Sequence, residues 1–278
     1  MTTCVVGLGK IGLPLAVQIA SKGELVKGAD ISEKVVRQIN EGDVPFPGEI
    51  DLPELLSKVK NAGLLEATTD TADAVRQSDT VIVVVPVVVD ESANPDFAAI
   101  DSATRDIASG LKPGSLICYE TTLPVGSTRN RFAPIIEEVS GLNCGLDVYI
   151  AFSPERVFSG RIFSDLRAYP KLVGGLDPIS SEKAVQFYEK VLDFDERSDL
   201  IRPNGVWDLG KAEAAEMAKL AETTYRNVNI ALANEFALHA ERLELDAYSI
   251  IEASNSQPFS HIHQPGIAVG GHCIPVYP

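Results

Sequence analysis

The sequence has few cysteines and no leader segment, and both absences limit what the protein can be. Its four cysteines include no Cys-x-x-Cys pair, and their spacing fits no zinc site. We therefore expect reduced thiols and no metal. The N-terminus lacks the basic and apolar regions of a signal peptide, and the apolar run 80–89 is too short to span a bilayer. These features favour a cytoplasmic protein.

Basic residues are also scarce relative to acidic ones. The chain has 24 Lys and Arg against 39 Asp and Glu, which gives a formal net charge of −15. Such a charge repels nucleic acid and anionic membranes, so we expect neither as a partner. An anionic ligand would need a local positive site. With 278 residues, 45% of them hydrophobic, the chain can form one large domain or two ordinary ones.

Short apolar runs alternate with helical patterns through the first half of the chain. The expected strands cover residues 3–6, 25–31, 80–87, 115–120 and 148–155, and the expected helices cover 10–23, 32–42, 71–79, 97–111 and 127–141. This alternation is typical of βαβ units. It predicts an α/β fold with a Rossmann-type, doubly wound parallel sheet that has helices on both faces.

The pattern changes after about residue 178. A helical segment at 180–192 is followed by residues 210–244, which are rich in Ala, Glu, Leu and Lys and contain no proline. We interpret this run as one long central helix that opens an all-α region. The predicted domains are therefore a Rossmann-like domain at 1–200 and a central helical domain at 201–278.

The first predicted helix begins with "GLGKIG", which places Gly7, Gly9 and Gly12 in the G-x-G-x-x-G spacing. In this pattern the first glycine permits a tight turn, the second lets a pyrophosphate approach the backbone, and the third lets helix and strand pack closely. N–H groups at the helix N-terminus would bind the phosphates. Asp30 ends the second strand, where a carboxylate would bind ribose hydroxyls and repel a 2′-phosphate. The predicted cofactor is therefore NAD and not NADP.

Two further segments carry candidate residues at the ends of predicted strands, where open α/β sheets bind ligands. Glu155 and Arg156 lie in "SPERVFSGR", and a simple turn is the alternative interpretation. Thr122 lies in "YETTLPVGST", and its hydroxyl group could contact a nicotinamide or position a water molecule. A turn or helix-cap role is the alternative for Thr122.

The remaining candidates lie in the C-terminal part. Lys219, Thr223 and Arg226 share one face of the long helix, and a solvated charged face is the alternative. Cys273 in "GGHCIP" is a candidate nucleophile, because the small residues before it allow a ligand to approach; a structural cysteine is the alternative. His272 is not assigned as its base, since adjacent side chains in an extended segment point apart.

Six segments occur in family order along the whole chain: "VVGLGKIGLPLA", "GADI", "TTLPVGST", "SPERV", "AEMAKLAETTYRNVNIALANEFA" and "HQPGIAVGGHCIPV". Together they resemble the nucleotide-sugar 6-dehydrogenase family, the UDP-glucose/GDP-mannose dehydrogenases. "SPERV" and "GGHCIPV" are more similar to the N-acetylhexosamine branch than to the UDP-glucose branch. The resemblance implies UDP-N-acetylmannosamine or a related UDP-N-acetylhexosamine as substrate, with UDP-glucose as the alternative.

The resemblance also implies a mechanism and a set of site residues. NAD would oxidise the sugar C6 alcohol to an aldehyde, the Cys273 thiolate would add to it, and a second oxidation would give a thioester. Hydrolysis would release a uronic acid, a polysaccharide precursor. The implied catalytic residues are Cys273, Lys219 for the oxyanions, Glu155 for the water, Thr122 and Thr223. The implied cofactor contacts are Gly7, Gly9, Lys10, Ile11, Gly12, Asp30, Pro86, Val87 and Thr122, and the implied substrate contacts are Arg156, Val157, Lys219, Thr223, Arg226 and Gly270.

Four positions depart from the family pattern. Thr223 stands where Asn is usual, Tyr277 where an Asp follows the cysteine motif, Phe259 where the N-acetyl branch often has Arg, and Val87 where Thr is usual. The Tyr277 difference puts any role of that Asp in water activation in doubt. We therefore expect a divergent subgroup with an altered sugar preference.

The resemblance further implies a homodimer through helix 210–244 and a third, UDP-binding domain beyond residue 278, so we expect this chain to be a fragment. Two other classes remain open. One is an NAD-binding dimeric module that has lost catalysis. The other is a β-hydroxyacid dehydrogenase, which shares the Rossmann start and the helix lysine but needs no cysteine.

Overall fold

The computed structural model describes residues 1–270, 274 and 276. The chain divides into two compact units. The first comprises Met1–Asp90 and Asn94–Glu216, and the second comprises Glu91–Ala93 and Met217–Pro278. The division at residue 200 that the sequence suggested stays a prediction.

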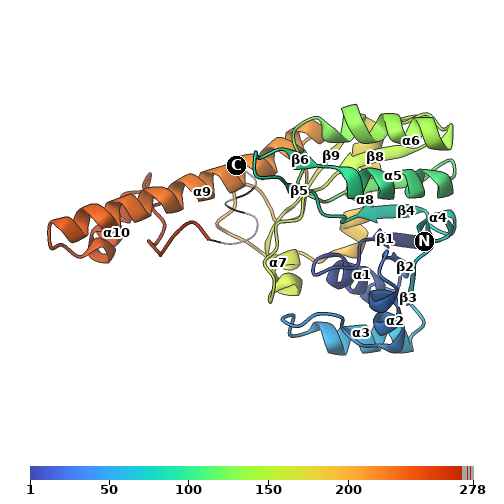
Figure 1. Ribbon diagram of the computed structural model, residues 1–278, viewed down its shortest axis with the longest axis horizontal. Coiled ribbons are helices and arrows are strands. Elements are labelled where there is room, and N and C mark those ends of the chain that lie inside the picture. Colours follow the sequence, from blue (N-terminus) through green and yellow to red (C-terminus); the bar gives the residue numbers. More distant parts are fainter. Residues whose placement is uncertain (271–273, 275, 277–278) are drawn as a thin grey trace. The chain divides into compact units, whose positions relative to one another are not determined.

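An eight-stranded sheet forms the centre of the first unit, in the strand order β10-β9-β8-β7-β4-β1-β2-β3 (Figure 1). Its strands are β1 (Thr2–Val6), β2 (Leu25–Ala29), β3 (Leu65–Thr68), β4 (Thr80–Val83), β7 (Leu116–Tyr119), β8 (Tyr149–Phe152), β9 (Lys171–Gly175) and β10 (Val206–Asp208). A separate ribbon pairs β5 (Val88–Val89) with β6 (Pro95–Asp96). The order runs outward from β1 in both directions, so the predicted doubly wound fold is confirmed.

The described ladders of this sheet are parallel, with one exception between β8 and β9. The expectation of a parallel sheet is therefore wrong at β9. Between β8 and β9 lies only the short helix α7 (Ile162–Ala168). A parallel partner needs a crossover that returns the chain to the far edge of the sheet, and this connection instead starts β9 at the edge where β8 ends.

Helices cover both faces of the sheet. They are α1 (Gly12–Ser21), α2 (Glu33–Glu41), α3 (Leu52–Asn61), α4 (Thr71–Arg76), α5 (Ala98–Gly110), α6 (Ala133–Ser140), α7, α8 (Pro178–Val191) and the start of α9 (Ala212–Arg242). Because side chains alternate along a strand, Cys4 and Val6 pack with α4, α5 and α6, whereas Val5 packs with α1, α3 and α8. The two core clusters thus place α5 and α6 on one face of the sheet and α1, α2 and α3 on the other.

Local signals place several helix ends. The Ser32 hydroxyl accepts a hydrogen bond from the Val35 N–H at the start of α2, and Gly42 ends that helix with a φ of 90°. The predicted helix 127–141 is less regular than expected. It begins with a π-helical turn, η1 (Thr128–Phe132), which continues into α6. Wide turns of this kind are frequent at functional sites.

The second unit is helical. It contains the part of α9 after Glu216 and the helix α10 (Ala247–Asn255). The Asn229 side chain accepts a hydrogen bond from the His263 N–H at 3.0 Å, and Asn234 accepts one from the Gly266 N–H at 2.8 Å. These bonds hold the segment after α10 along α9. The single long helix predicted at 210–244 is confirmed, with 31 residues.

Among the described residues, none of the helices combines the length and the apolar character that crossing a membrane requires.

Candidate functional site

The turn between β1 and α1 has the geometry that its three glycines predict. Gly7 has a φ of +92°, and its N–H donates a hydrogen bond to the Ala29 carbonyl at 2.8 Å. A Cβ atom on Gly12 would lie 1.8 Å from the Gly7 carbonyl oxygen, so no other residue fits there. A Cβ atom on Gly9 would meet no protein atom within 4 Å. The chain therefore leaves open the space beside Gly9 that a bound pyrophosphate would need.

A cavity of about 290 Å³ lies beside this turn. Gly7, Ala29, Asp30, Pro86 and Asp106 are among the residues that line it. The cavity is at the carboxyl ends of β1, β2 and β4, where the strand order changes direction. Open α/β sheets bind nucleotides at this kind of position.

The Asp30 carboxylate is fixed by the backbone on both sides. One oxygen accepts a hydrogen bond from the Leu8 N–H at 2.8 Å, and the other accepts one from the Ser32 N–H at 2.9 Å. Both hydrogen-bond donors are neutral backbone N–H groups, so the carboxylate is oriented at the cavity wall by the backbone alone. A fixed carboxylate can accept hydrogen bonds from ribose hydroxyls and disfavours a phosphate at the same place.

The other predicted cofactor residues lie in the glycine-rich turn and after β4 and β7, and Pro86 among them lines the cavity. Lys10 and Ile11 belong to the glycine-rich turn, where Lys10 is exposed and Ile11 is partly buried. Val87 follows Pro86 and packs partly against the core. Thr122 is partly buried after β7. The open space at Gly9 and the fixed acid at Asp30 fit a dinucleotide such as NAD.

The loop after β7 is tied down at both ends. The Thr121 hydroxyl donates a hydrogen bond to the Val85 carbonyl at 2.6 Å, next to the cavity. Farther along, the Glu216 carboxylate on α9 accepts hydrogen bonds from the Gly126 N–H and from Thr128. Thr122 lies between these two anchors, so its backbone is held in place from both directions.

Glu155 belongs to a buried cluster of charges that the sequence did not indicate. Its carboxylate lies 2.9 Å from the Lys171 ammonium nitrogen, and Glu120 lies 3.0 Å from the same nitrogen. Tyr188 donates a hydrogen bond to the second Glu120 oxygen at 2.6 Å. The Lys171 nitrogen is also 4.8 Å from the centre of the Tyr188 ring. The side chains of Lys171, Glu120 and Glu155 are 4%, 0% and 11% exposed.

Burial and charge act in opposite directions in this cluster. Burial raises the pKa of Glu120 to about 7, although the Lys171 ammonium group lowers it. Burial lowers the pKa of Lys171, but Glu120 and Glu155 outweigh this effect and raise it above its usual value. Lys171 is therefore protonated at neutral pH, and Glu120 is close to its titration point.

The loop after Glu155 is also held by the protein. The Arg156 guanidinium group donates to the Pro170 carbonyl, just before β9. The buried Glu49 carboxylate accepts hydrogen bonds from the N–H groups of Gly160 and Ile162, each at 2.7 Å. Val157 packs partly against the core. The loop thus has a defined path from the end of β8 to α7.

The second unit carries the predicted residues of the long helix. Lys219 and Thr223 are 9% and 3% exposed, so a solvated charged face does not describe this stripe. The Thr223 hydroxyl donates to the Lys219 carbonyl at 3.0 Å, which is a bond within the helix. Arg226 is partly buried, and Gly270 is exposed.

Three of the residues named from the sequence, His272, Cys273 and Tyr277, lie outside the described residues. Phe259 is described and is 88% exposed.

Four residues with a clear role in the geometry were not found from the sequence: Glu49, Glu120, Lys171 and Glu216. Only Glu120 carried a signal, since a carboxylate directly after a buried strand faces the edge where ligands bind. The others contact partners that are 16 to 113 residues away, which no local pattern reveals.

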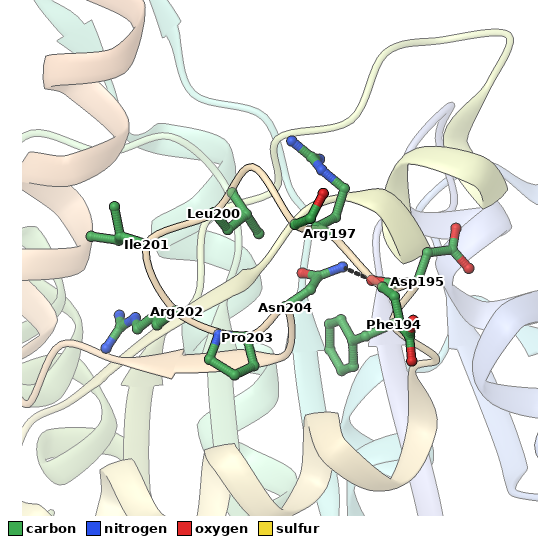
Figure 2. Close-up of a pocket in the computed structure, with 10 residues that line it drawn as sticks. Phe194, Asp195, Arg197, Leu200, Ile201, Arg202, Pro203 and Asn204 are labelled. Carbon is green, nitrogen blue, oxygen red and sulfur yellow. Dashed lines mark hydrogen bonds between the residues drawn. The ribbon is translucent and has the colours of Figure 1, made fainter.

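A second cavity, of about 680 Å³, is formed by the connection between α8 and β10 (Figure 2). Its arginines already have partners, because Arg197 pairs with Asp199 and Arg202 lies 4.1 Å from the centre of the Trp207 ring. The Asn204 side chain donates to the Asp195 carbonyl at 2.9 Å and closes the loop on itself. These contacts engage both arginines and Asn204, and we assign no ligand to the cavity.

Sequence comparison gives two matches to models of one family. Residues 1–192 match the NAD binding domain of the UDP-glucose/GDP-mannose dehydrogenase family, and residues 213–278 match its central domain. The β-hydroxyacid dehydrogenases considered above are a different family.

Individual relatives agree with these matches. The chain is 40% identical over 278 residues to a UDP-N-acetyl-D-mannosamine dehydrogenase from Pyrococcus horikoshii, covering all of this chain and 63% of the relative. The protein of the same description from Escherichia coli K12 is 36% identical over 286 residues, with 100% and 64% covered. A solved structure of the Pyrococcus horikoshii UDP-D-ManNAc dehydrogenase has a TM-score of 0.90 at 37% identity, over 99% of this chain and 62% of that one. The chain thus spans somewhat less than two thirds of the length of these relatives.

Proposed function

Because the chain belongs to the UDP-glucose/GDP-mannose dehydrogenase family, we propose that it is the NAD-binding and central part of an NAD-dependent UDP-sugar 6-dehydrogenase. The proposed substrate is UDP-N-acetylmannosamine. The observation that carries this choice is the whole-chain similarity, at 40% identity, to a dehydrogenase described for that sugar. Other UDP-N-acetylhexosamines and UDP-glucose are the alternatives. The cytoplasmic location and the role in polysaccharide precursor synthesis stay predictions.

The proposed reaction converts the C6 hydroxymethyl group of the sugar to a carboxylate. When bound, NAD⁺ accepts the hydride that leaves the sugar carbon in each of two oxidation steps. Between these steps the Cys273 thiolate adds to the aldehyde, and the second oxidation leaves a thioester. Water then bonds to the thioester carbon, the C–S bond breaks, and the thiolate returns. One hydroxymethyl group, two NAD⁺ and one water give one carboxylate, two NADH and three protons.

The described residues support separate parts of this reaction. Asp30 and the glycine-rich turn would hold the cofactor, with Pro86 and Val87 beside it and Thr122 near the reacting end. Glu155 would direct and deprotonate the hydrolytic water, which matches its position at the carboxyl end of β8. Lys219 would stabilise the oxyanions, as a buried ammonium group is suited to do.

The proposed substrate contacts are those that the family resemblance implies. Arg156 and Val157 lie in the loop after β8, Thr223 and Arg226 lie on α9, and Gly270 lies after α10. Guanidinium groups are well suited to a diphosphate, because they can donate two parallel hydrogen bonds. The two arginines would therefore pair with the substrate.

The proposed partner is a second copy of the chain, bound through the long helix. Val228, Leu232 and Phe236 lie on one face of α9 at four-residue spacing, and they are 60%, 45% and 42% exposed. An apolar face of this kind is costly to leave in water. Light scattering should give the mass of a dimer, and Leu232→Glu should reduce it to that of a monomer.

The function is tested by counting NADH. The protein, expressed from its complete gene, is incubated with NAD⁺ and a panel that includes UDP-N-acetylmannosamine, UDP-glucose and GDP-mannose. We expect two NADH per molecule of UDP-N-acetylmannosamine consumed, together with the uronic acid. Cofactor binding without NADH from any sugar would leave the non-catalytic module as the better interpretation.

Replacement of Cys273 distinguishes a dehydrogenase that forms a thioester from a dehydrogenase that needs no cysteine. Cys273→Ser should block acid formation if the thioester is on the pathway, while binding of NAD⁺ stays unchanged. Acid formation at the wild-type rate in Cys273→Ser would contradict the proposed mechanism.

A further inference from the structure

The charge cluster around Lys171 is made by four elements that meet at one edge of the sheet. Glu120 follows β7, Glu155 follows β8, Lys171 begins β9, and Tyr188 lies in α8. The two carboxylates approach the ammonium nitrogen to within 3.0 Å and 2.9 Å. The proposed reaction makes use of Glu155, but it gives no role to the other three groups.

The reversed direction of β9 brings Lys171 to this edge. In the antiparallel ladder, Ala151 pairs with Gly175 and Phe152 pairs with Gly174. Continuing the register by three residues places Glu155 opposite Lys171, the first residue of β9. In a parallel strand the first residue would lie at the opposite edge, and the lysine could not reach the carboxylate.

The cluster is too costly to be an accident of packing. Burying an ammonium group and two carboxylates removes all three from water, and their attraction often only offsets that cost. Well-packed hydrophobic residues of similar volume are often as stabilising as a buried ion pair, or more so. A buried cluster that adds little stability, and that ends at a residue of the reaction, points to a role in the reaction.

We propose that Lys171 is a positioning residue for Glu155, and that Glu120 and Tyr188 hold its ammonium group in place. The proposal deepens the proposed function and rests on it. The ammonium group binds one Glu155 oxygen and keeps the carboxylate ionised and turned. Glu155 can then take the proton of the water that attacks the thioester.

The charged groups around Glu155 indicate a specific effect on pH dependence. Lys171 faces it from β9, and Glu120 faces it from the end of β7. Arg156 is the next residue in the chain. Tyr188 and Cys118 are neighbours of Glu120. Without the lysine, two carboxylates would share one site with no cation between them. Such a pair favours the protonated form, in which Glu155 cannot act as a base.

The test replaces Lys171 by methionine in the enzyme expressed from its complete gene. In Lys171→Met, the acid limb of the pH profile of kcat should move upward by about one to three units, the usual effect of a neighbouring opposite charge. At neutral pH, acid formation should fall by about ten- to a hundredfold, since a displaced catalytic group loses rate to that extent. The rapid formation of two NADH per active site should remain, and acyl-enzyme should accumulate.

Two further variants test whether the effect comes from loss of any ion-paired lysine or from misfolding. Lys27→Met removes another ion-paired strand lysine, whose partner Glu66 lies 2.6 Å away in the same sheet, and it should leave the pH profile unchanged. If Lys171→Met does not fold, the double variant Lys171→Met with Glu120→Gln carries no unpaired buried charge at Glu120. Its acid limb should still move upward, by less than in the single variant, because Glu155 has lost its ammonium partner but has no second carboxylate beside it. An acid limb that stays at the wild-type pH in either Lys171 variant overturns the proposal. Absence of NADH in the wild-type enzyme would instead contradict the proposed function.

Discussion

The Glu216 carboxylate accepts two hydrogen bonds from Thr128, one from its N–H group at 2.9 Å and one from its hydroxyl group at 2.6 Å. Glu216 is fully buried on α9, and Thr128 begins the π-helical turn before α6. A third bond comes from the Gly126 N–H. The carboxylate thus serves as a cap for a helix to which it does not belong, since a helix N-terminus has free N–H groups and attracts negative charge.

We predict that Glu216→Gln lowers the free energy of unfolding by about 1 to 3 kcal/mol. The substitution replaces one carboxylate oxygen, an acceptor, by an amide NH₂ group, which is a donor. That NH₂ group would then face the N–H donor of Gly126 or Thr128, and one hydrogen bond would be lost. The measurement is urea unfolding followed by circular dichroism. The matched control is Glu213→Gln, one turn earlier, which removes the negative charge from a partly exposed ion pair with Arg129 and should cost less than about 1 kcal/mol. Equal losses in both variants would contradict the capping role.

The glycine-rich turn allows folding and cofactor binding to be separated. We predict that Gly9→Ala folds with an unchanged melting temperature but loses most NAD⁺ binding, because the new methyl group occupies space that the protein leaves open. Gly12→Ala should not fold stably, since its methyl group would lie 1.8 Å from a carbonyl oxygen. Calorimetric titration with NAD⁺ and thermal unfolding give the two readouts. Normal NAD⁺ affinity in Gly9→Ala would place the pyrophosphate elsewhere.

The acid at the cavity wall should set the choice between the two nicotinamide cofactors. We predict that Asp30→Asn weakens NAD⁺ binding by about tenfold and raises the affinity for NADP⁺ relative to NAD⁺, because the carboxylate no longer repels a 2′-phosphate. Asp106→Asn removes an equal charge from the same cavity and should not change the ratio of the two affinities. If both variants change the ratio equally, the overall charge of the cavity decides specificity, and not Asp30.

Glu120 should make stability depend on pH in an unusual direction for a carboxylate. Burial raises its pKa from 4.5 to about 7, so between these values the folded protein binds a proton that the unfolded chain releases. The free energy of unfolding should therefore fall as pH rises from about 4.5 to about 7, by up to about 3 kcal/mol.

This pH dependence should be absent in Glu120→Gln, which is compared with the wild type by urea unfolding at several pH values. Glu213→Gln serves again as the surface control and should keep the wild-type slope. A difference between wild type and Glu120→Gln that does not vary from pH 4.5 to pH 7 would show that Glu120 does not titrate in this range.

The parts of the fold that depend on local patterns could be predicted from the sequence. The three glycines, Asp30 and the run 210–244 each carry their signal within a short segment, and the structure has the corresponding turn, strand end and helix. The position of Glu155 at a strand end was predicted for the same reason. These features depend on side-chain periodicity and backbone freedom, which a single sequence displays directly.

The rest of the site depends on contacts between distant segments. Lys171 opens the run "KLVGG", which looks like any buried strand, and nothing local indicates that this strand runs antiparallel to β8. Glu216 likewise resembles a solvated helix residue in sequence, yet it is fully buried. Their roles appear only when the register of the sheet and the packing of α9 are known.

The ladder between β8 and β9 also determines which changes of chain length the cluster can tolerate. Residues 153–170 connect the two strands, and the pairing of Ala151 with Gly175 does not depend on how many residues lie in between. Insertions at the tip of this connection, away from Glu155 and the loop's anchors, would leave Lys171 where it is. A deletion of one residue between Lys171 and Gly175 would turn the lysine to the other face of the sheet. Alignments of homologues should therefore show gaps in the connection and none within the strand.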